Sequence, residues 1–415
     1  MNGAQCFQTL PTELVSLVFQ ELYYSLDALK ACSSTCKRWR SIALPLLLTR
    51  LCVVDGNLFL RAYQFFVLNA PSTGVSIAQP VREMVIDPHS HSSPLGADVP
   101  NVIPIWNNQR CILAFFRAFP RLKVLHCTLS IASLVSSSLP QSSITTLDIN
   151  GWHYDAPSFT KLFRGGAGTL RSVTLQDIRF PALHGGKAHT FSPLQVSMVA
   201  LTELTLIRCD DLRFFPTVIQ MPNVKTLRMD GCDMPPATSL PPSLEMLVIQ
   251  RERFQPDTRS DSVGPFSADN VAVICHFTNP VRRNIQQTIS RICVSSSIKH
   301  LELVLLDNDD NSDTSTPTSP SSSTSADYFP FTRDSVFEDF VINLHKYDAL
   351  ERFVITAEQE TDLISSHMKE FQARVPMLWR LGIMDVRVGV SSALDPQRFR
   401  YVKSPGGSWV WSRDW

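Results

Sequence analysis

The stretches LTELTLIRC (201–209) and VKTLRMDGC (224–232) carry one pattern of side chains, and this pattern decides which fold the sequence predicts. In both stretches apolar residues stand at the first, fourth and sixth positions, and a cysteine stands at the ninth. Side chains alternate along a β-strand, so the fourth and sixth residues point to one side and the third and fifth to the other. Each stretch therefore predicts a strand with an apolar face and a polar face.

The same six-residue pattern recurs along most of the chain. Clear copies also begin at Leu122, Ile144, Leu170, Leu244, Ile298, Leu350 and Leu378, and weaker copies begin at Leu48 and Val81. From 122 to 244 the copies begin about 20 to 31 residues apart, close to the ~20–29-residue period of leucine-rich repeats. The longer intervals before 298 and 350 indicate insertions or degenerate repeats.

The pattern LxxLxLxxC/N is similar to the leucine-rich-repeat signature, and Cys209 and Cys232 occupy its ninth position. Segments between copies, such as residues 106–120, have the apolar periodicity of amphipathic helices. The resemblance implies an irregular α/β solenoid with a curved parallel sheet and helices on its convex side.

An ordinary α/β domain is the competing interpretation, and it predicts apolar residues on both faces of each strand. The outward positions of this chain are instead polar, which favours the solenoid and an exposed sheet that meets solvent or a protein target. The expected target-binding positions are His126, Asp148, Asn150, Thr174, Gln176, Glu203, Thr205 and Arg228. Further outward positions are Asp230, His300, Glu302, Arg352 and Arg380.

A separate helical module precedes the repeats, in LPTELVSLVFQELYYSLDALKACSSTCKRWRSIALPLL (10–47). Pro11 suits the first position of a helix, and Leu14, Leu17, Val18 and Leu22 recur at helical spacing after it. A second helix begins near Ser25 and Asp27, and a third carries Cys36, Trp39 and Ala43 until Pro45 ends it. So small a unit buries little surface alone and needs a partner or a following domain.

This module resembles the F-box motif. The matching residues are Leu10, Pro11, Glu13, Leu14, Phe19, Leu22, Asp27, Leu29, Cys36, Arg38, Trp39, Ile42 and Ala43, while Ala28 departs from the larger apolar residue common in the family. The resemblance implies docking on a Skp-type adaptor, and through it on a cullin. The residues that would bind the adaptor are Leu10, Pro11, Leu14, Phe19, Leu22, Leu29, Cys36 and Trp39.

The composition limits the partners and the compartment. Lys plus Arg and Asp plus Glu are each 38, so no basic excess indicates nucleic-acid binding. Charges at Arg50, Asp55 and Arg61 interrupt the most apolar stretch, which argues against a membrane span, and the N-terminus lacks the pattern of a signal peptide. The ten cysteines are scattered without a CxxC pair, so we expect reduced thiols and a cytoplasmic or nuclear protein.

The motifs of common catalytic sites are absent from the sequence, and we expect no enzyme, cofactor or metal site. Neither GxSxG, HExxH nor a P-loop occurs. The run from Asp307 lacks the glycine and the glutamate of a calcium loop, and His89 and His91 lack an evident third ligand.

The predicted organisation is α+β, with an F-box-like module at 1–50 and a repeat domain at 51–415. Residues 307–327 are rich in Ser, Thr and Asp without large apolar residues, so we expect a disordered insert there. Thr316 and Ser319, each followed by proline, are possible phosphorylation sites in that insert. Trp409 and Trp411 would lie on one side of a final strand that covers the end of the repeats, or would line a pocket.

By the F-box resemblance the chain would be a substrate-recognition adaptor of a Skp–cullin–F-box ubiquitin ligase. A non-catalytic repeat scaffold, whose helical head is only a structural cap, is the alternative. A hydrolase would need a Ser/His/Asp set that the sequence does not locate.

Overall fold

The computed structural model describes residues 10–22, 25–53, 56–69, 78–86, 109–136, 139, 142–151, 156–178, 196–209, 219–232, 241, 244–250, 268–276, 298–306, 351–357, 384–388, 400–403 and 409–412. The chain divides into two compact units. The first comprises residues 1–150, 156–170 and 397–415, and the second comprises 151–155 and 171–396. The predicted insert at 307–327 and the pair His89 and His91 lie outside the described residues.

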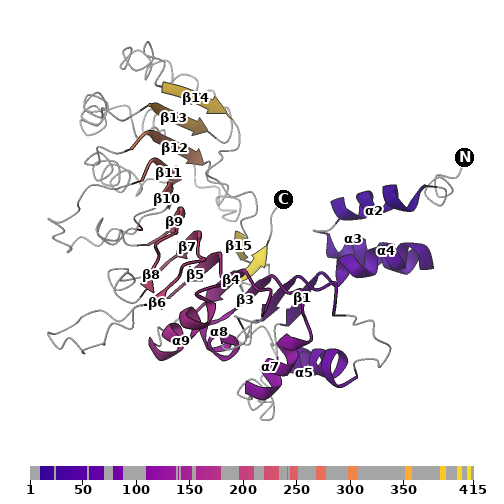
Figure 1. Ribbon diagram of the computed structural model, residues 1–415. Helices are drawn as coiled ribbons and strands as arrows, with labels where there is room; N and C mark the ends of the chain where they lie inside the picture. The colour runs from indigo at the N-terminus through magenta and orange to yellow at the C-terminus, as the bar shows by residue number, and fades with distance from the viewer. Residues whose placement is uncertain are drawn as a thin grey trace, which may run out of the picture. The chain divides into compact units, whose positions relative to one another are not determined.

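The first unit begins with helices α2 (Thr12–Glu21), α3 (Leu26–Thr35) and α4 (Lys37–Leu47), drawn in indigo in Figure 1. They enclose a small core in which Val15, Phe19, Leu29 and Ala43 are buried. The rings of Phe19 and Trp39 meet edge to face at 5.5 Å, a favoured geometry for an aromatic pair. The three predicted helices are therefore confirmed.

The ends of two of these helices differ from the sequence-based expectation. Pro11 is the N-cap of α2 rather than its first residue, and Pro45 lies inside α4, which continues to Leu47. The proline removes only its own hydrogen bond from the ladder, which continues beyond it, since the N–H of Leu48 donates to the Leu44 carbonyl over 3.0 Å.

The rest of the first unit combines parallel strands with helices. Its strands are β1 (Arg50–Val53), β2 (Glu83–Ile86), β3 (Val124–Thr128) and β4 (Thr146–Asn150), paired in that order. Its helices are α5 (Gly56–Tyr63), the π-helical turn η1 (Gln64–Leu68), α7 (Gln109–Arg117), α8 (Leu129–Val135) and α9 (Ala156–Gly166). An antiparallel pair, β15 (Arg400–Lys403) and β16 (Trp409–Ser412), also belongs to this unit.

Apolar side chains hold this sheet to its helices. Met84, Leu125 and Leu147, neighbours across three strands, are fully buried, and α8 contacts both β3 and β4. Gly165 of α9 lies so close to the backbone of Ser136 that a methyl group there would overlap the Ser136 carbonyl. The expected helix at 106–120 is confirmed as α7.

The second unit is a run of parallel strands (Figure 1). In order of pairing they are β5 (Ser172–Gln176), β7 (Glu203–Ile207), β9 (Thr226–Asp230), β10 (Met246–Gln250), β11 (Asn270–His276), β12 (His300–Leu306), β13 (Arg352–Ala357) and β14 (Met384–Val388). The short strands β6 (Val196–Ser197) and β8 (Ile219–Gln220) form a small parallel pair of their own.

Every clear copy of the six-residue pattern but one corresponds to a described strand, from β3 and β4 in the first unit to β13 in the second. The weaker copies at Leu48 and Val81 form β1 and β2. The copy from Leu378 lies outside the described residues, and the strand that pairs with β13 is β14, which begins later, at Met384. The pattern also missed β11, because Ala268 takes the place of the first large apolar residue.

The outward face changes character along the second unit. The strand register places Thr174, Thr205 and Arg228 in one row on that face, and continues the row to Val248, Ala272, Glu302 and Val354. Val248, Ala272 and Val354 are buried. The expectation of a polar outward face is therefore wrong at Val248 of β10, Ala272 of β11 and Val354 of β13, whereas Arg352, the outward position predicted on β13, is exposed. The α+β class, with a helical N-terminus followed by parallel strands, is confirmed.

Candidate functional site

The helical module leaves apolar side chains on its surface. Leu14, Leu17 and Val18 of α2 are 47, 57 and 43% exposed, and Leu44 of α4 is 46% exposed. The three residues of α2 lie at i, i+3 and i+4 and so share one side of the helix. The adjoining side of the same helix supplies Val15 and Phe19 to the core. Helix α2 is thus apolar on two sides, and only one of them is used within the module.

The eight predicted adaptor-binding residues occupy three kinds of position. Pro11, Leu14 and Cys36 are exposed, Leu10, Leu22 and Trp39 are half-buried against the core, and Phe19 and Leu29 are fully inside it. Phe19 and Leu29 therefore support the surface from beneath. Sequence reasoning left Leu17, Val18 and Leu44 out of the predicted site. The sequence does indicate Leu17 and Val18, because α2 carries more apolar residues than the small core of the module can bury.

Two arginines of α4 tie the helices of the module together. Arg38 Nη2 donates hydrogen bonds to the backbone carbonyl of Leu10 and, over 3.3 Å, to Thr12 Oγ1. Arg40 Nε donates to the carbonyl of Ser33, in the last turn of α3, over 3.0 Å. The start of α2 and the last turn of α3 are therefore both held from α4 by guanidinium–carbonyl bonds.

The outward face of β1–β4 carries a second polar site, a row of alternating charge. Arg50 Nε lies 3.1 Å from Glu83 Oε1, and His126 Nε2 lies 3.4 Å from the same oxygen. His126 Nδ1 lies 3.0 Å from Asp148 Oδ2. Glu83 and Asp148 are buried, and the His126 side chain is 12% exposed.

The charge state of His126 follows from its neighbours. Burial lowers its pKa, but hydrogen bonds to Asp148 and Glu83 and the charges of both carboxylates outweigh burial and raise the pKa to about 9. The imidazolium form therefore predominates at neutral pH, and it is paired with a carboxylate on each side, Asp148 at Nδ1 and Glu83 at Nε2. The row then reads plus, minus, plus, minus from β1 to β4 and has no net charge.

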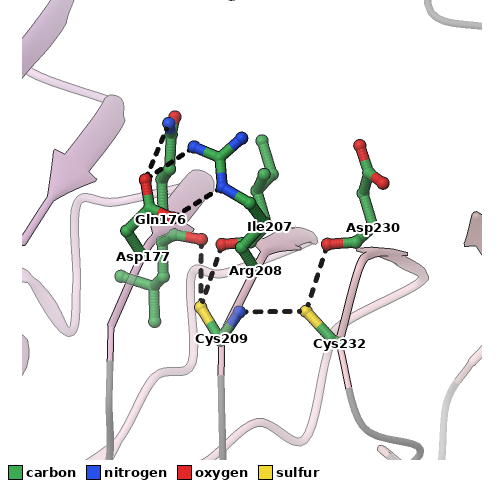
Figure 2. A network of polar contacts seen from close by, with 8 residues as sticks. Gln176, Asp177, Ile207, Arg208, Cys209, Asp230 and Cys232 are labelled. Carbon is green, nitrogen blue, oxygen red and sulfur yellow. Dashed lines mark hydrogen bonds and ion pairs between the residues drawn. The ribbon is translucent and has the colours of Figure 1, made fainter. Parts of the chain in front are cut away.

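A third polar network lies where β5, β7 and β9 end. Asp177 and Arg208, each directly after a strand, have φ values of 54° and 50°, and Gly231 follows β9 with φ 63°. Figure 2 shows Asp177 and Arg208 in a two-pronged ion pair, with both N···O distances 2.6 Å. Gln176 Nε2 also donates to Asp177 Oδ2, over 3.2 Å. This left-handed backbone turns each strand out of the sheet at the same level.

The two cysteines at the ninth position connect these strand ends. The backbone N–H of Cys209 donates to Cys232 Sγ over 3.3 Å, and Cys209 Sγ donates to the carbonyl of Leu175 over 3.3 Å (Figure 2). Hydrogen bonding with Cys209, together with burial, raises the pKa of the Cys232 thiol well above its ordinary value. The Cys232 thiol is therefore protonated, and the sulfur atoms of both cysteines take part in hydrogen bonds between the strand ends.

The predicted target-binding positions are not equally exposed. Glu203 is exposed, Asn150, Thr174, Thr205 and Arg228 are half-buried, and His126 is largely covered. Asp148 and Gln176 are buried, contrary to the expectation that they face solvent. Ion pairing with His126 compensates the burial of Asp148, and the neighbouring Asp177 carboxylate accepts from the Gln176 amide. The prediction did not include Glu83, which pairs with His126, or Arg50, which pairs with Glu83, because their strands carry the weaker copies of the pattern.

The described residues contain no group of three or more His, Cys, Asp or Glu placed to hold a metal ion. The helices in the described part of the chain are also too short or too polar to span a bilayer.

Comparison with known families identifies the helical module. Residues 7–54 match the family model described as F-box-like. No curated protein matches the chain significantly. The match supports an F-box protein, and F-box domains typically bind Skp-type adaptors. It covers the module and not the strands that follow.

Proposed function

We propose that this protein is the substrate-recognition adaptor of a Skp–cullin–F-box ubiquitin ligase. The observation that carries the proposal is the apolar side of α2, with Leu14, Leu17 and Val18 exposed on a module that matches the F-box-like family. Exposed apolar side chains that lie together typically mark a protein-interaction site. The expected occupant is the Skp-type adaptor, which would in turn connect the protein to a cullin.

In this proposal the protein is not an enzyme. Ubiquitin transfer would occur in other subunits of the ligase, and this chain would hold the adaptor and a target. A cytoplasmic or nuclear location follows from that role. The alternative, a repeat scaffold whose helices only cap the next domain, predicts no adaptor binding.

A surface substitution distinguishes these two functions. Leu17→Glu places a charge in the centre of the apolar side of α2, where an interface residue that is a hot spot contributes about 2 kcal/mol or more, equivalent to about 30-fold in affinity. We expect the full-length variant to lose at least that much affinity for a purified Skp-type adaptor in calorimetry. Its melting temperature should stay unchanged, because Leu17 is 57% exposed.

The matched control is Leu68→Glu, which changes an equally exposed apolar side chain, 64% exposed, on η1. This variant should bind the adaptor like the wild type. Equal affinities for all three proteins would refute docking through α2, and absence of wild-type binding would favour the scaffold.

The second half of the proposal assigns target recognition to the outward faces of the repeat strands. Glu203 on β7 is exposed, and Arg228 on β9 is half-buried one strand away. Reversing both charges, by Glu203→Lys with Arg228→Glu, should remove partners that copurify with the protein while leaving adaptor binding intact. An unchanged set of copurified proteins would place target binding elsewhere.

A further inference from the structure

Arg38 contacts the segment that leads into α2 across a long interval of sequence. Its Nη2 donates to the carbonyl of Leu10, 28 residues away, and to the hydroxyl of Thr12, 26 residues away. The N-cap residue of α2 is Pro11, whose side chain offers no cap hydrogen bond. Arg38 is a donor and so does not cap the N–H groups of this helix, but its bonds to Leu10 and Thr12 fix the segment that leads into it.

The site is electrostatically unfavourable for a cation. The N-terminus of a helix carries partial positive charge, so a guanidinium there gains nothing from the helix dipole. Arg40 makes the same kind of bond at the C-terminal end of another helix, α3, where the helix dipole favours a cation. Arg40 is thus in the position expected of a residue that only stabilises the module, and Arg38 is not.

The contacts of Leu10 indicate a different role for Arg38. The Leu10 side chain packs against the core of the module, while its carbonyl accepts a hydrogen bond from Arg38. The following residue, Pro11, is exposed. Holding Leu10 from both sides leaves Pro11 with one orientation at the surface, next to the apolar side of α2.

We propose that Arg38 is a positioning residue for adaptor docking, which presents Leu10 and Pro11 in the conformation that the adaptor binds. This inference rests on the proposed function of the helical module. It assigns Arg38 no contact with the adaptor, and its effect on affinity passes through Leu10 and Pro11.

The experiment compares Arg38→Gln with Arg40→Gln in the full-length protein. Each variant loses one guanidinium–carbonyl bond from α4. A hydrogen bond to a charged group contributes enough free energy that its loss in Arg38→Gln should weaken adaptor binding about tenfold in calorimetry. Arg40→Gln should change the affinity for the adaptor by less than about twofold. Arg38→Lys, which keeps the charge and one donor, should give an intermediate affinity. Thr12→Val, which leaves the Leu10 bond intact, should lose less than about threefold.

Two further measurements separate positioning from stability and from direct contact. Amide exchange at Val15, whose N–H donates to the Pro11 carbonyl over 3.1 Å, should become faster in Arg38→Gln and not in Arg40→Gln. In a background of Leu10→Ala with Pro11→Ala, adding Arg38→Gln should change affinity by less than about twofold, because residues in one network are not additive.

A tenfold loss that persists in that background would overturn the inference, since Arg38 would then act on its own contacts. Equal losses in Arg38→Gln and Arg40→Gln would also overturn it and leave a stabilising role. If the wild-type protein does not bind the adaptor, the proposed function fails together with this inference. If it binds and Arg38→Gln binds equally well, only this inference fails.

Discussion

The outward faces of β1–β4 and of β10–β13 both include buried side chains, and the two regions remove these side chains from water by different means. In the first region Glu83, His126 and Asp148 are removed from water as ion pairs. In the second, Val248 and Ala272 are fully buried apolar side chains at outward positions. The comparison shows that alternation in sequence identifies the inward face of a strand, whereas polarity of the outward residue does not establish its exposure.

The largest test of this difference is removal of a buried charge. Glu83→Ala leaves Arg50 and His126 without their shared carboxylate, and breaking a buried ion pair costs about 3–5 kcal/mol. We expect a loss of that size in chemical denaturation. The control, Glu245→Ala, removes the exposed ion pair with Lys225 and should cost within about 0.5 kcal/mol. Equal costs would mean that the charged row is as hydrated as the surface pair.

The second test uses pH. The folded-state pKa of His126 is about 9, above the ordinary 6.5, because the carboxylates of Asp148 and Glu83 favour the protonated ring more than burial disfavours it. The other charged group near this site is Arg50, which pairs with Glu83. Protonation of His126 therefore adds about 3 kcal/mol to the free energy of unfolding below about pH 6.5, and this stabilisation is lost as the pH rises through about 9. The free energy of unfolding of the wild type relative to His126→Gln, measured at pH 6 and pH 10, should fall by that amount. A constant difference would show that His126 does not titrate in this range.

The smallest test exchanges valine and threonine, which have nearly the same shape. Val248→Thr buries a hydroxyl at a fully buried outward position and should destabilise the protein by about 1–2 kcal/mol. The reverse change, Thr205→Val, affects a half-buried outward residue of the same row and should stay within about 0.5 kcal/mol. Thermal melts of the two variants measure both values. If Val248→Thr were neutral, the outward face of β10 would be open to water.

The sequence predicted the strands well where the repeat pattern is complete. Leu204 and Leu206, or Leu227 and Met229, alternate with polar residues, and such alternation is a local property that needs no knowledge of the neighbours. It missed β11 because Ala268 is too small to count as an anchor, although it is buried like the residues it replaces. The sequence also did not predict where β14 begins, because its register is determined by pairing with β13.

The candidate site was predicted less completely than the strands. Leu10, Pro11 and Leu14 followed from the F-box resemblance, but the pattern did not distinguish Phe19 and Leu29, which are core, from Leu17 and Val18, which are surface. That distinction depends on how α2 packs on α3 and α4. The charged row joins residues from four strands, and Arg50 and Asp148 are far apart in the sequence. No local sequence motif therefore predicts this row.

The cysteine pair at the strand ends gives the second unit a chemical reporter of its own unfolding. Cys209 and Cys232 are buried, and the raised pKa of Cys232 keeps thiolate, the form that alkylating reagents attack, scarce in the folded protein. Cys36, at the start of α4, is exposed and accessible to the same reagents. Alkylation of Cys209 and Cys232 therefore measures how often the strand ends open, while Cys36 records reagent exposure independently of opening.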